Sequence, residues 1–454
     1  MLRTIIGAVT AVAVTGMATA VIASEARTAQ TATTARAATT AQDVQGGGWG
    51  ADPPIPVGKH SFGADVVGVY DGRMPTIDIG SVRLWDDRTR WSYIEKERGR
   101  YDWKVLDTLV DGARAKGLPV LYTMGQTPRW ANPDGDPCPY NNESENEEER
   151  EPCTSAPPQD LNVWDEYVRQ VVTRYKGRIE AYELWNEATL TKYYSGTVPQ
   201  MVAMAQRAYR IIKEIDPSAL VISPSATMMH RNTTRDWVAQ FAAQGGYAYA
   251  DRVAVHLYKD GDDKAIGWPE RSVEIVNDLR AILASHGVTK PIWDTETTEE
   301  PEPDPPFPGT AQQAADWVTR YYLMGLYNRL SRSYYYGWGS KDLGLKVQTA
   351  GEPPTLAGRA AEQLVGWMKG ASIRYCGSGT ANGLPGGMWQ CAFTYGQGEY
   401  ALIRWMGMGA APVRYGTGAG TYEAERIGGQ PWAVRPGDTI EINGTPVIIR
   451  YKGA

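Results

Sequence analysis

Short apolar runs alternate with longer amphipathic stretches between residues 65 and 370 of the chain. The short runs have strand length, and the longer stretches carry apolar residues at helical spacing. The eight predicted strands are Asp65–Tyr70, Ser81–Trp85, Pro119–Met124, Ile179–Trp185, Leu220–Pro224, Arg252–Tyr258, Pro291–Thr295 and Ser333–Trp338. Helical spacing is found in the segments 103–113, 164–175, 199–215, 272–286, 310–328 and 354–368. This alternation is typical of βαβ units around a parallel sheet.

Eight such repeats predict an α/β fold, a (β/α)8 TIM barrel, rather than a doubly wound open sheet. The first strand is not followed by the glycine fingerprint that a dinucleotide-binding sheet needs there. In a barrel the chemistry is expected at the C-terminal ends of the strands.

After Lys369 the sequence pattern changes to Gly-rich turns and short runs that alternate as strands do. These runs are Trp389–Tyr395, Tyr400–Met406, Pro412–Tyr415 and Val447–Tyr451. They predict a small β-sandwich appended to the barrel. We therefore expect a catalytic barrel over residues 45–370 and an accessory β-sandwich domain over residues 371–454.

The N-terminus has the pattern of a secretory signal. A charged start is followed by a weakly apolar run from Ile5 to Met17 and by Ala18-Thr19-Ala20, which fits a cleavage site, although cleavage nearer Ala26 is also compatible. Residues 1–26 are accordingly predicted to be a signal peptide, with an uncleaved membrane anchor as the alternative. Residues 27–44 are mainly Ala, Thr, Arg and Gln, a composition typical of a disordered linker. We expect a secreted protein with no integral membrane segment after cleavage.

Composition narrows the possible partners. The chain has 46 Lys+Arg and 52 Asp+Glu, a net charge of −6, so no basic field is available for nucleic acid. The aromatic residues are 16 Trp and 26 Tyr against only 4 Phe. Trp and Tyr combine an apolar ring with a polar group, which suits surfaces that are partly wet.

Four cysteines, Cys138, Cys153, Cys376 and Cys391, show neither a CxxC motif nor nearby His pairs, so a zinc or thioredoxin-type site is poorly supported. Because an exported protein folds in an oxidising environment, we expect these cysteines to form disulfides. Of three possible connectivities, pairing Cys138 with Cys153 and Cys376 with Cys391 closes the shortest loops at modest entropic cost.

Two predicted strands end on glutamates. The fourth strand runs into Trp185-Asn186-Glu187, and the seventh ends at Asp294-Thr295-Glu296. These strands face each other across a barrel, so both carboxylates can converge at its mouth. A separation of about 5 to 5.5 Å suits a retaining glycosidase, whereas about 6.5 to 9.5 Å leaves room for the water of an inverting enzyme.

This ordered set of strand ends resembles clan A glycoside hydrolases, and family 39 is the most similar. The resemblance covers most of residues 65 to 370 and includes Arg83 on the second strand, Trp130 after the third, His256 and Tyr258 on the sixth and Trp338 after the eighth.

The resemblance implies a role for each of these residues. Glu187 would be the general acid and base, and Glu296 the nucleophile. Asn186 would donate to the sugar 2-hydroxyl, Arg83 and Tyr258 would donate toward Glu296, and His256 would contact the acid or the sugar. Trp338 and Trp130 would offer flat faces to the sugar, although both could simply cap the barrel. No cofactor and no metal are implied, because the carboxyl groups alone can carry out the reaction.

Glu183 and Asp294 lie deeper on the two predicted strands that end at Glu187 and Glu296, and they are expected to have structural roles. Asp86 and Asp87 follow the second predicted strand and could reach substrate. The segments 133–158 and 299–308 have no counterpart that we can assign in the family. They lie on the expected catalytic face, so they would decide between end-trimming and mid-chain cleavage, and we favour an endo-acting enzyme.

Two other interpretations remain at this stage. One is a carbohydrate-binding barrel that has lost turnover, although the complete set of Glu187, Glu296, Asn186, Arg83 and Tyr258 argues against it. The other is a family 5 type endoglucanase, which shares the same Asn-Glu and strand-seven Glu arrangement and differs in substrate.

Overall fold

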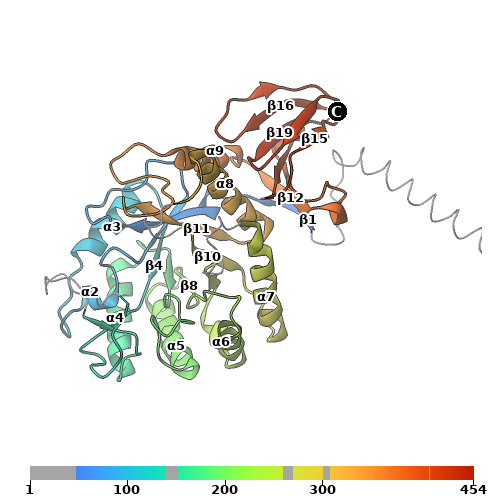
Figure 1. Ribbon diagram of the computed structural model, residues 1–454. Helices are drawn as coiled ribbons and strands as arrows, with labels where there is room; N and C mark the ends of the chain where they lie inside the picture. Colours follow the sequence, from blue (N-terminus) through green and yellow to red (C-terminus); the bar gives the residue numbers. More distant parts are fainter. Residues whose placement is uncertain (1–47, 140–151, 259–268, 300–306, 408, 454) are drawn as a thin grey trace, which may run out of the picture.

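A parallel eight-stranded sheet forms the centre of the molecule (Figure 1). The computed structural model describes residues 48–139, 152–258, 269–299, 307–407 and 409–453. The sheet has the order β8-β7-β4-β3-β2-β11-β10-β9, and isolated bridges from Ile222 to Arg252 and from Ala226 to Val255 join its two edge strands. The sheet is thus closed into the predicted (β/α)8 barrel.

The barrel strands are β2 (Phe62–Val67), β3 (Ser81–Leu84), β4 (Val120–Thr123), β7 (Ala181–Glu183), β8 (Leu220–Ile222), β9 (Val253–Val255), β10 (Ile292–Thr297) and β11 (Arg332–Gly339). Each overlaps one of the eight predicted segments, but the first runs from Phe62 to Val67 and so begins and ends earlier than the predicted Asp65–Tyr70. The cause of the early end is Gly68, whose φ of 72° turns the chain out of the extended conformation.

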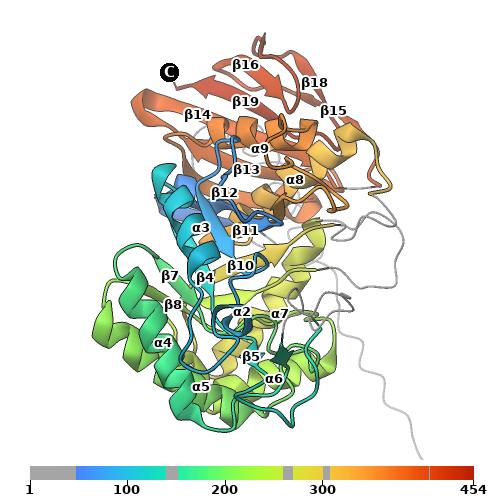
Figure 2. The ribbon, with the colours of Figure 1, turned by 90° about the vertical axis from the view of Figure 1, so that its left-hand side faces the viewer.

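Helices surround the barrel (Figure 2), namely α2 (Trp91–Ile94), α3 (Lys104–Ala115), α4 (Leu161–Tyr175), α5 (Val198–Ile215), α6 (Asn232–Ala243), α7 (Ser272–Ser285), α8 (Ala311–Tyr327) and α9 (Leu356–Trp367). Capping boxes fix the starts of α5 and α8, at Thr197 with Gln200 and at Thr310 with Gln313. Within the described residues, no helix is long and apolar enough to span a bilayer.

The C-terminal part folds as antiparallel sheets, as predicted. A seven-stranded sheet has the order β1-β12-β13-β14-β19-β16-β17, and β15 pairs with β18 alone. The strands are β12 (Ser372–Ser378), β13 (Met388–Thr394), β14 (Glu399–Met406), β15 (Val413–Gly416), β16 (Thr421–Arg426), β17 (Trp432–Ala433), β18 (Thr439–Ile442) and β19 (Val447–Lys452). A two-stranded sheet of β5 (Thr127–Pro128) and β6 (Cys153–Thr154) lies elsewhere in the chain.

The first described strand departs from the expected domain division. β1 (Trp49–Pro56) was assigned to the barrel domain of residues 45–370, but it pairs antiparallel with β12 at the edge of the C-terminal sheet. The pairing covers an edge of β12 that would otherwise expose unpaired backbone groups. The N-terminal signal and linker predictions concern residues 1–44, which lie outside the described part of the chain.

Both disulfides connect the predicted pairs, Cys138 with Cys153 and Cys376 with Cys391. The second joins the neighbouring strands β12 and β13, where the two cysteines are directly opposite each other. The first closes the segment whose residues 140–151 lie outside the described chain.

The barrel and the C-terminal sheet share a buried polar contact. Glu270, in a short 3-10 turn before α7, accepts hydrogen bonds from Arg320 Nε of α8 at 2.7 Å and from Trp405 Nε1 of β14 at 2.8 Å. The side chains of Glu270 and Arg320 are each only 5% exposed. Helix α8 is accordingly buried on nearly all sides, because it lies between the barrel and the sheet.

We expect Glu270→Ala to lower the free energy of unfolding by about 3 kcal/mol or more, because it leaves a buried guanidinium without its partner. Glu274→Ala, which removes an exposed carboxylate from the first turn of α7, is the matched control and should change stability by less than about 1 kcal/mol. Urea denaturation followed by tryptophan fluorescence measures both. Equal midpoints for the two variants would contradict the structural role of Glu270.

Candidate active site

The two strand-end glutamates meet at the mouth of the barrel. Glu187 follows the end of β7 and Glu296 lies near the end of β10, and both residues are buried, at 7% and 8% exposed. One carboxylate oxygen of each, together with a ring nitrogen of His256, lie within 4.8 Å of one another. The carboxyl groups are therefore close enough to act on a single glycosidic bond.

Arg83 lies at the centre of this group and is fully buried. Its Nη1 donates to Glu296 Oε2 at 2.8 Å and to Asp65 Oδ1 at 3.1 Å, while Nε donates to Glu183 Oε2 at 2.8 Å and Nη2 to Asn186 Oδ1 at 2.7 Å. One guanidinium thus orients four acceptors from three strands, β2, β7 and β10, and the segment that follows β7.

Glu296 has a second donor on its other oxygen. The hydroxyl of Tyr258 donates to Glu296 Oε1 at 2.8 Å, and Arg83 occupies Oε2. Burial alone would raise the pKa of Glu296, but the charges of His256 and Arg83 and the hydrogen bonds from Tyr258 and Arg83 outweigh it, so the pKa lies below its usual value. This carboxylate is held ionised and in a fixed orientation.

His256 contacts the other glutamate. Its Nδ1 lies 3.1 Å from Glu187 Oε1 and 3.9 Å from Glu296 Oε1. Burial lowers the pKa of the imidazole. The charges of Glu296 and Glu187 and the hydrogen bond to Glu187 together raise the pKa by more than burial lowers it, so the net shift is upward. The structure therefore places His256 in contact with Glu187, one of the two contacts that the resemblance implied.

The backbone around Glu187 has an unusual conformation. The φ of Glu187 is 47°, in the left-handed region that side chains other than Gly rarely adopt. Its N–H donates to Ser225 Oγ at 2.9 Å, and the N–H of Ala188 donates to the Ser225 carbonyl at 3.0 Å. Ser225, just after β8, therefore fixes the turn that presents the Glu187 carboxyl to the mouth.

The deeper carboxylates have structural partners. Glu183 is fully buried and accepts from Arg83, from Thr123 Oγ1 at 2.6 Å and from Thr295 Oγ1 at 2.7 Å. Asp294 accepts from Thr297 Oγ1 and from Tyr321 OH, both at 2.9 Å, and burial raises its pKa to about 7. These contacts agree with the structural roles expected from their position on the strands.

The aromatic positions differ from those expected. Trp338 is 1% exposed and its Nε1 donates to Gln348 Oε1 at 2.8 Å, so its ring is enclosed by protein and does not present an open face. The pairing of β11 with β2 shifts register between Tyr335 and Trp338, and this irregularity turns Trp338 away. Trp130 is half-buried, and its Nε1 donates a hydrogen bond to the Glu95 carbonyl at 2.7 Å.

Tyr336, two residues before Trp338 on β11, is partly exposed. Burial, followed by the charges of Asp86, Glu296 and Asp65, raises its pKa well above the usual value. The other two tyrosines of the run Tyr334–Tyr336 are fully buried.

Two acidic residues complete the site. Asp65, on β2, pairs in register with Arg83 on β3. Asp86 follows β3 with a side chain 15% exposed, lies 3.6 Å from Arg90 Nη1, and has a pKa raised to about 7 by burial and then by the charge of Glu296. The Oδ2 atom of Asp86 is buried and has no hydrogen-bond partner among the described residues.

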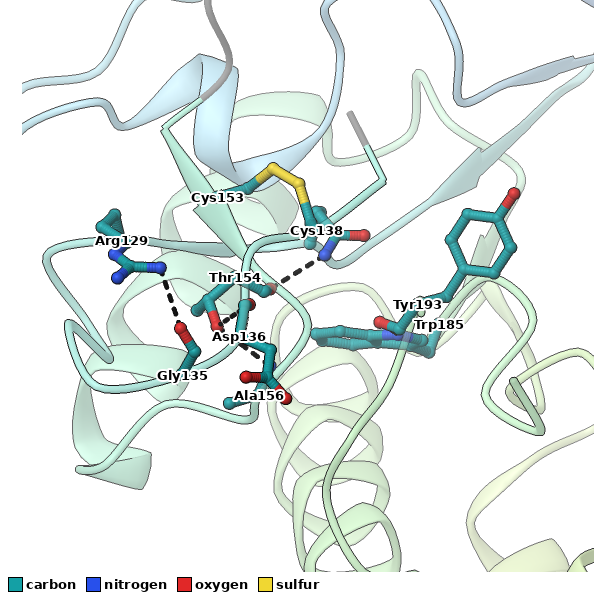
Figure 3. The surroundings of a disulfide bond; sticks show 10 residues. Arg129, Gly135, Asp136, Cys138, Cys153, Thr154, Ala156, Trp185 and Tyr193 are labelled. Atoms are coloured by element: carbon teal, nitrogen blue, oxygen red, sulfur yellow. Dashed lines mark hydrogen bonds between the residues drawn. A yellow bond between two sulfur atoms is a disulfide. The ribbon is translucent and has the colours of Figure 1, made fainter. Parts of the chain in front are cut away.

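A disulfide-anchored loop lies near Trp185 (Figure 3). Near the Cys138–Cys153 bond, Thr154 Oγ1 donates to the Asp136 carbonyl at 2.7 Å, and Gln126 Nε2 donates to the Thr154 carbonyl at 2.8 Å. Trp185, directly before Asn186, is fully buried near this loop. Its Nε1 donates a hydrogen bond to the Tyr193 carbonyl at 3.2 Å. The loop therefore packs close to the segment that carries the Asn-Glu pair.

The three groups Glu187, His256 and Glu296 are also near enough to hold a metal ion. Here, however, both oxygens of Glu296 already accept hydrogen bonds, and the Arg83 guanidinium is 2.8 Å from one of them. A divalent cation would be placed against a buried positive charge. The donor set therefore fits an acid and a nucleophile better than a metal site.

Comparison with known proteins agrees with this geometry. Residues 82–222 match the family model described as glycosyl hydrolase family 10. Among solved structures, a family 39 glycoside hydrolase from Bacteroides cellulosilyticus WH2 has a TM-score of 0.60 at 16% identity, with 87% of this chain and 82% of that chain covered. A family 39 enzyme from Xanthomonas axonopodis pv. citri has a TM-score of 0.58 at 16% identity, covering 88% and 95%.

A family 30 xylanase C from Talaromyces cellulolyticus is also similar, with a TM-score of 0.57 at 14% identity and 88% and 98% of the two chains covered. The family match and the shared fold confirm the resemblance to clan A glycoside hydrolases, with family 39 prominent among the similar structures. The chain is thus similar to clan A glycoside hydrolases in its fold and in the family match over residues 82–222.

We expect Tyr258→Phe to lower kcat/KM about 10- to 100-fold, because it removes one hydrogen bond to the ionised Glu296. Losing that donor raises the pKa of Glu296 toward its ordinary value. Ionised Glu296 is then lost at a higher pH, so the acidic limb of the pH–rate profile should move to higher pH. Tyr400→Phe, at an exposed position of the C-terminal sheet, is the control and should leave the profile unchanged. A lower rate with an unmoved acidic limb would contradict this role of Tyr258.

Proposed function

We propose that the protein is a secreted, retaining glycoside hydrolase that cleaves a polysaccharide or oligosaccharide by double displacement, with endo action. The observation that carries the proposal is the pair Glu187 and Glu296, whose nearest oxygens lie within 4.8 Å, with Glu296 held by both Arg83 and Tyr258. That spacing favours direct attack by a carboxylate over attack by an intervening water.

In the first step, Glu296 attacks the anomeric carbon while the carboxylic acid of Glu187 donates its proton to the leaving oxygen. This step forms a covalent glycosyl ester on Glu296 and releases the aglycone side of the glycan. In the second step, Glu187 removes a proton from water, the water oxygen attacks the anomeric carbon, and the ester breaks to regenerate ionised Glu296. The two inversions together retain the anomeric configuration.

The neighbouring groups have matching roles. Asn186 Oδ1 is occupied by Arg83, which leaves the Asn186 amide N–H groups free to donate to the sugar 2-hydroxyl. That hydrogen bond strengthens as positive charge develops on the sugar ring. His256, 3.1 Å from Glu187, responds to the change in charge as Glu187 loses and regains its proton. No cofactor takes part in these steps.

Secretion and endo action have separate support. The signal-like N-terminus and the two disulfides favour an oxidising compartment outside the cytosol. The inserts at residues 133–158 and 299–308 follow the third and seventh predicted barrel strands in the sequence, and we expect them to shape a groove for mid-chain binding. The competing functions are a non-catalytic carbohydrate-binding barrel and a family 5 type endoglucanase.

We expect reducing ends to be released from at least one member of a panel of polysaccharides and aryl glycosides by a protein lacking residues 1–44. Glu187→Ala and Glu296→Ala should each lower release about 100-fold or more, because each removes a group that acts in the transition state. Glu362→Gln, an exposed carboxyl of α9, should leave it unchanged, and so should EDTA. Binding to a glycan without any release would favour the non-catalytic barrel, and preference for β-glucan would favour the family 5 type.

Retention has its own test. An aryl glycoside with a good leaving group needs little protonation, so Glu187→Ala should still be glycosylated but should hydrolyse the ester slowly. Mass spectrometry of peptides from this variant should find the sugar on Glu296. Proton NMR of the first product should show the anomer of the substrate, and the opposite anomer would rule out the retaining mechanism. Products of several lengths early in the reaction indicate endo action, and accumulation of a single short sugar indicates exo action.

A further inference from the structure

A second cavity lies at the opposite end of the barrel from Glu187 and Glu296. It has a volume of about 490 Å³ and is lined by residues at the N-terminal ends of the barrel strands, among them Leu220, which begins β8, Arg252, just before β9, and Arg332, which begins β11. Residues of β1 and the segment after it form another wall, including Trp49 and Ile55. The volume falls within the range of about 300–1,000 Å³ that is usual for ligand sites. We call this space the floor cavity.

Positive charge is in excess around the floor cavity. Arg332 is paired with Glu180, with Nη1 and Nη2 donating to its two oxygens at 2.7 and 2.8 Å. Arg252 and Arg329, by contrast, have no carboxylate partner in the part of the chain that the structure describes. Arg329 lies over the ring of Trp49 at 5.4 Å, and its charge also helps burial to lower the pKa of Arg280. In a chain of net charge −6, this local excess favours an anion.

A rigid aromatic ring also lines the floor cavity. Trp293 is 2% exposed, and its ring is held by Arg332, whose guanidinium lies 4.4 Å from the ring centre, and by Tyr334. The indole therefore contributes a fixed wall to this space.

The remaining wall is apolar. Ile55 is 47% exposed and, with Leu220, Leu326 and Ile373, contributes aliphatic surface, while Trp49 adds an aromatic ring. A ligand for this space therefore needs both an anionic group and a body with apolar faces. A sugar ring has such faces, because its C–H groups gather on one side while its hydroxyls project outward.

We propose that the floor cavity is a second binding site, which takes an acidic saccharide with its uronate carboxylate on Arg252 and Arg329. Two guanidinium groups suit a planar carboxylate, since each can donate two parallel hydrogen bonds. The choice of a saccharide over another organic acid rests on the proposed function. The site itself lies across the barrel from the catalytic residues, and its function is to hold an acidic glycan on the enzyme.

The test is calorimetric titration of the full chain carrying Glu296→Gln, so that no turnover occurs. The probes are cellobiouronic acid, the neutral disaccharide cellobiose, benzoate and inorganic phosphate. We expect the acidic disaccharide to bind and the other three to bind at least about tenfold more weakly. Equal binding of cellobiose would overturn the role of the carboxylate, and equal binding of benzoate or phosphate would overturn the saccharide class.

Variants locate the binding. The double variant Arg252→Gln with Arg329→Gln should lower affinity for the acidic disaccharide about tenfold or more, because it removes both guanidinium groups. Arg414→Gln, an exposed arginine on β15, is the control and should have no effect. Unchanged affinity in the double variant, with a native circular dichroism spectrum, would place binding elsewhere and overturn the proposal, as would the absence of binding by any probe. Binding here is measured without catalysis, so its outcome is separate from that of the turnover assays.

Discussion

The guanidinium of Arg83 is the contact on which the arrangement at the barrel mouth depends. It is buried among Asp65, Glu183, Asn186 and Glu296, which come from β2, β7 and β10 or the segment after β7, and donates to all of them. Removing one charge from such a buried set leaves the others uncompensated, at a cost of about 3–5 kcal/mol. The same interactions therefore stabilise the barrel mouth and keep Glu296 ionised, so stability and the proposed catalysis are linked through one side chain.

The carboxyl groups around Arg83 differ because their surroundings differ. Glu296 has two hydrogen-bond donors and two nearby positive charges, and its pKa is lowered. Asp86 is close to the same guanidinium but has fewer partners, so burial and the charge of Glu296 raise its pKa to about 7. One buried cation can keep only part of a cluster of acids ionised, and hydrogen bonds decide which part.

The sequence predicted the eight barrel strands because each is a short apolar run between amphipathic stretches, and the strand ends placed Glu187 and Glu296 together. Arg83 and His256 were added by the resemblance to family 39. The sequence did not predict features that depend on register or on distant pairing. Trp338 is enclosed by protein, and the register shift beside it in β11 is not revealed by any alternation of apolar residues. Strand β1 joined β12 through backbone hydrogen bonds, which leave no mark on side-chain patterning.

The pairing of β1 with β12 also has a consequence for how the chain acquires its fold. A sheet edge built from the first described strand and a strand beyond the barrel cannot form until nearly the whole polypeptide is present. Contacts between such distant segments slow folding, because a long loop must close before they contribute. For a chain that crosses a membrane before folding, this delay would keep it unfolded during export, and completion of the C-terminal sheet would then secure both ends of the barrel in one step.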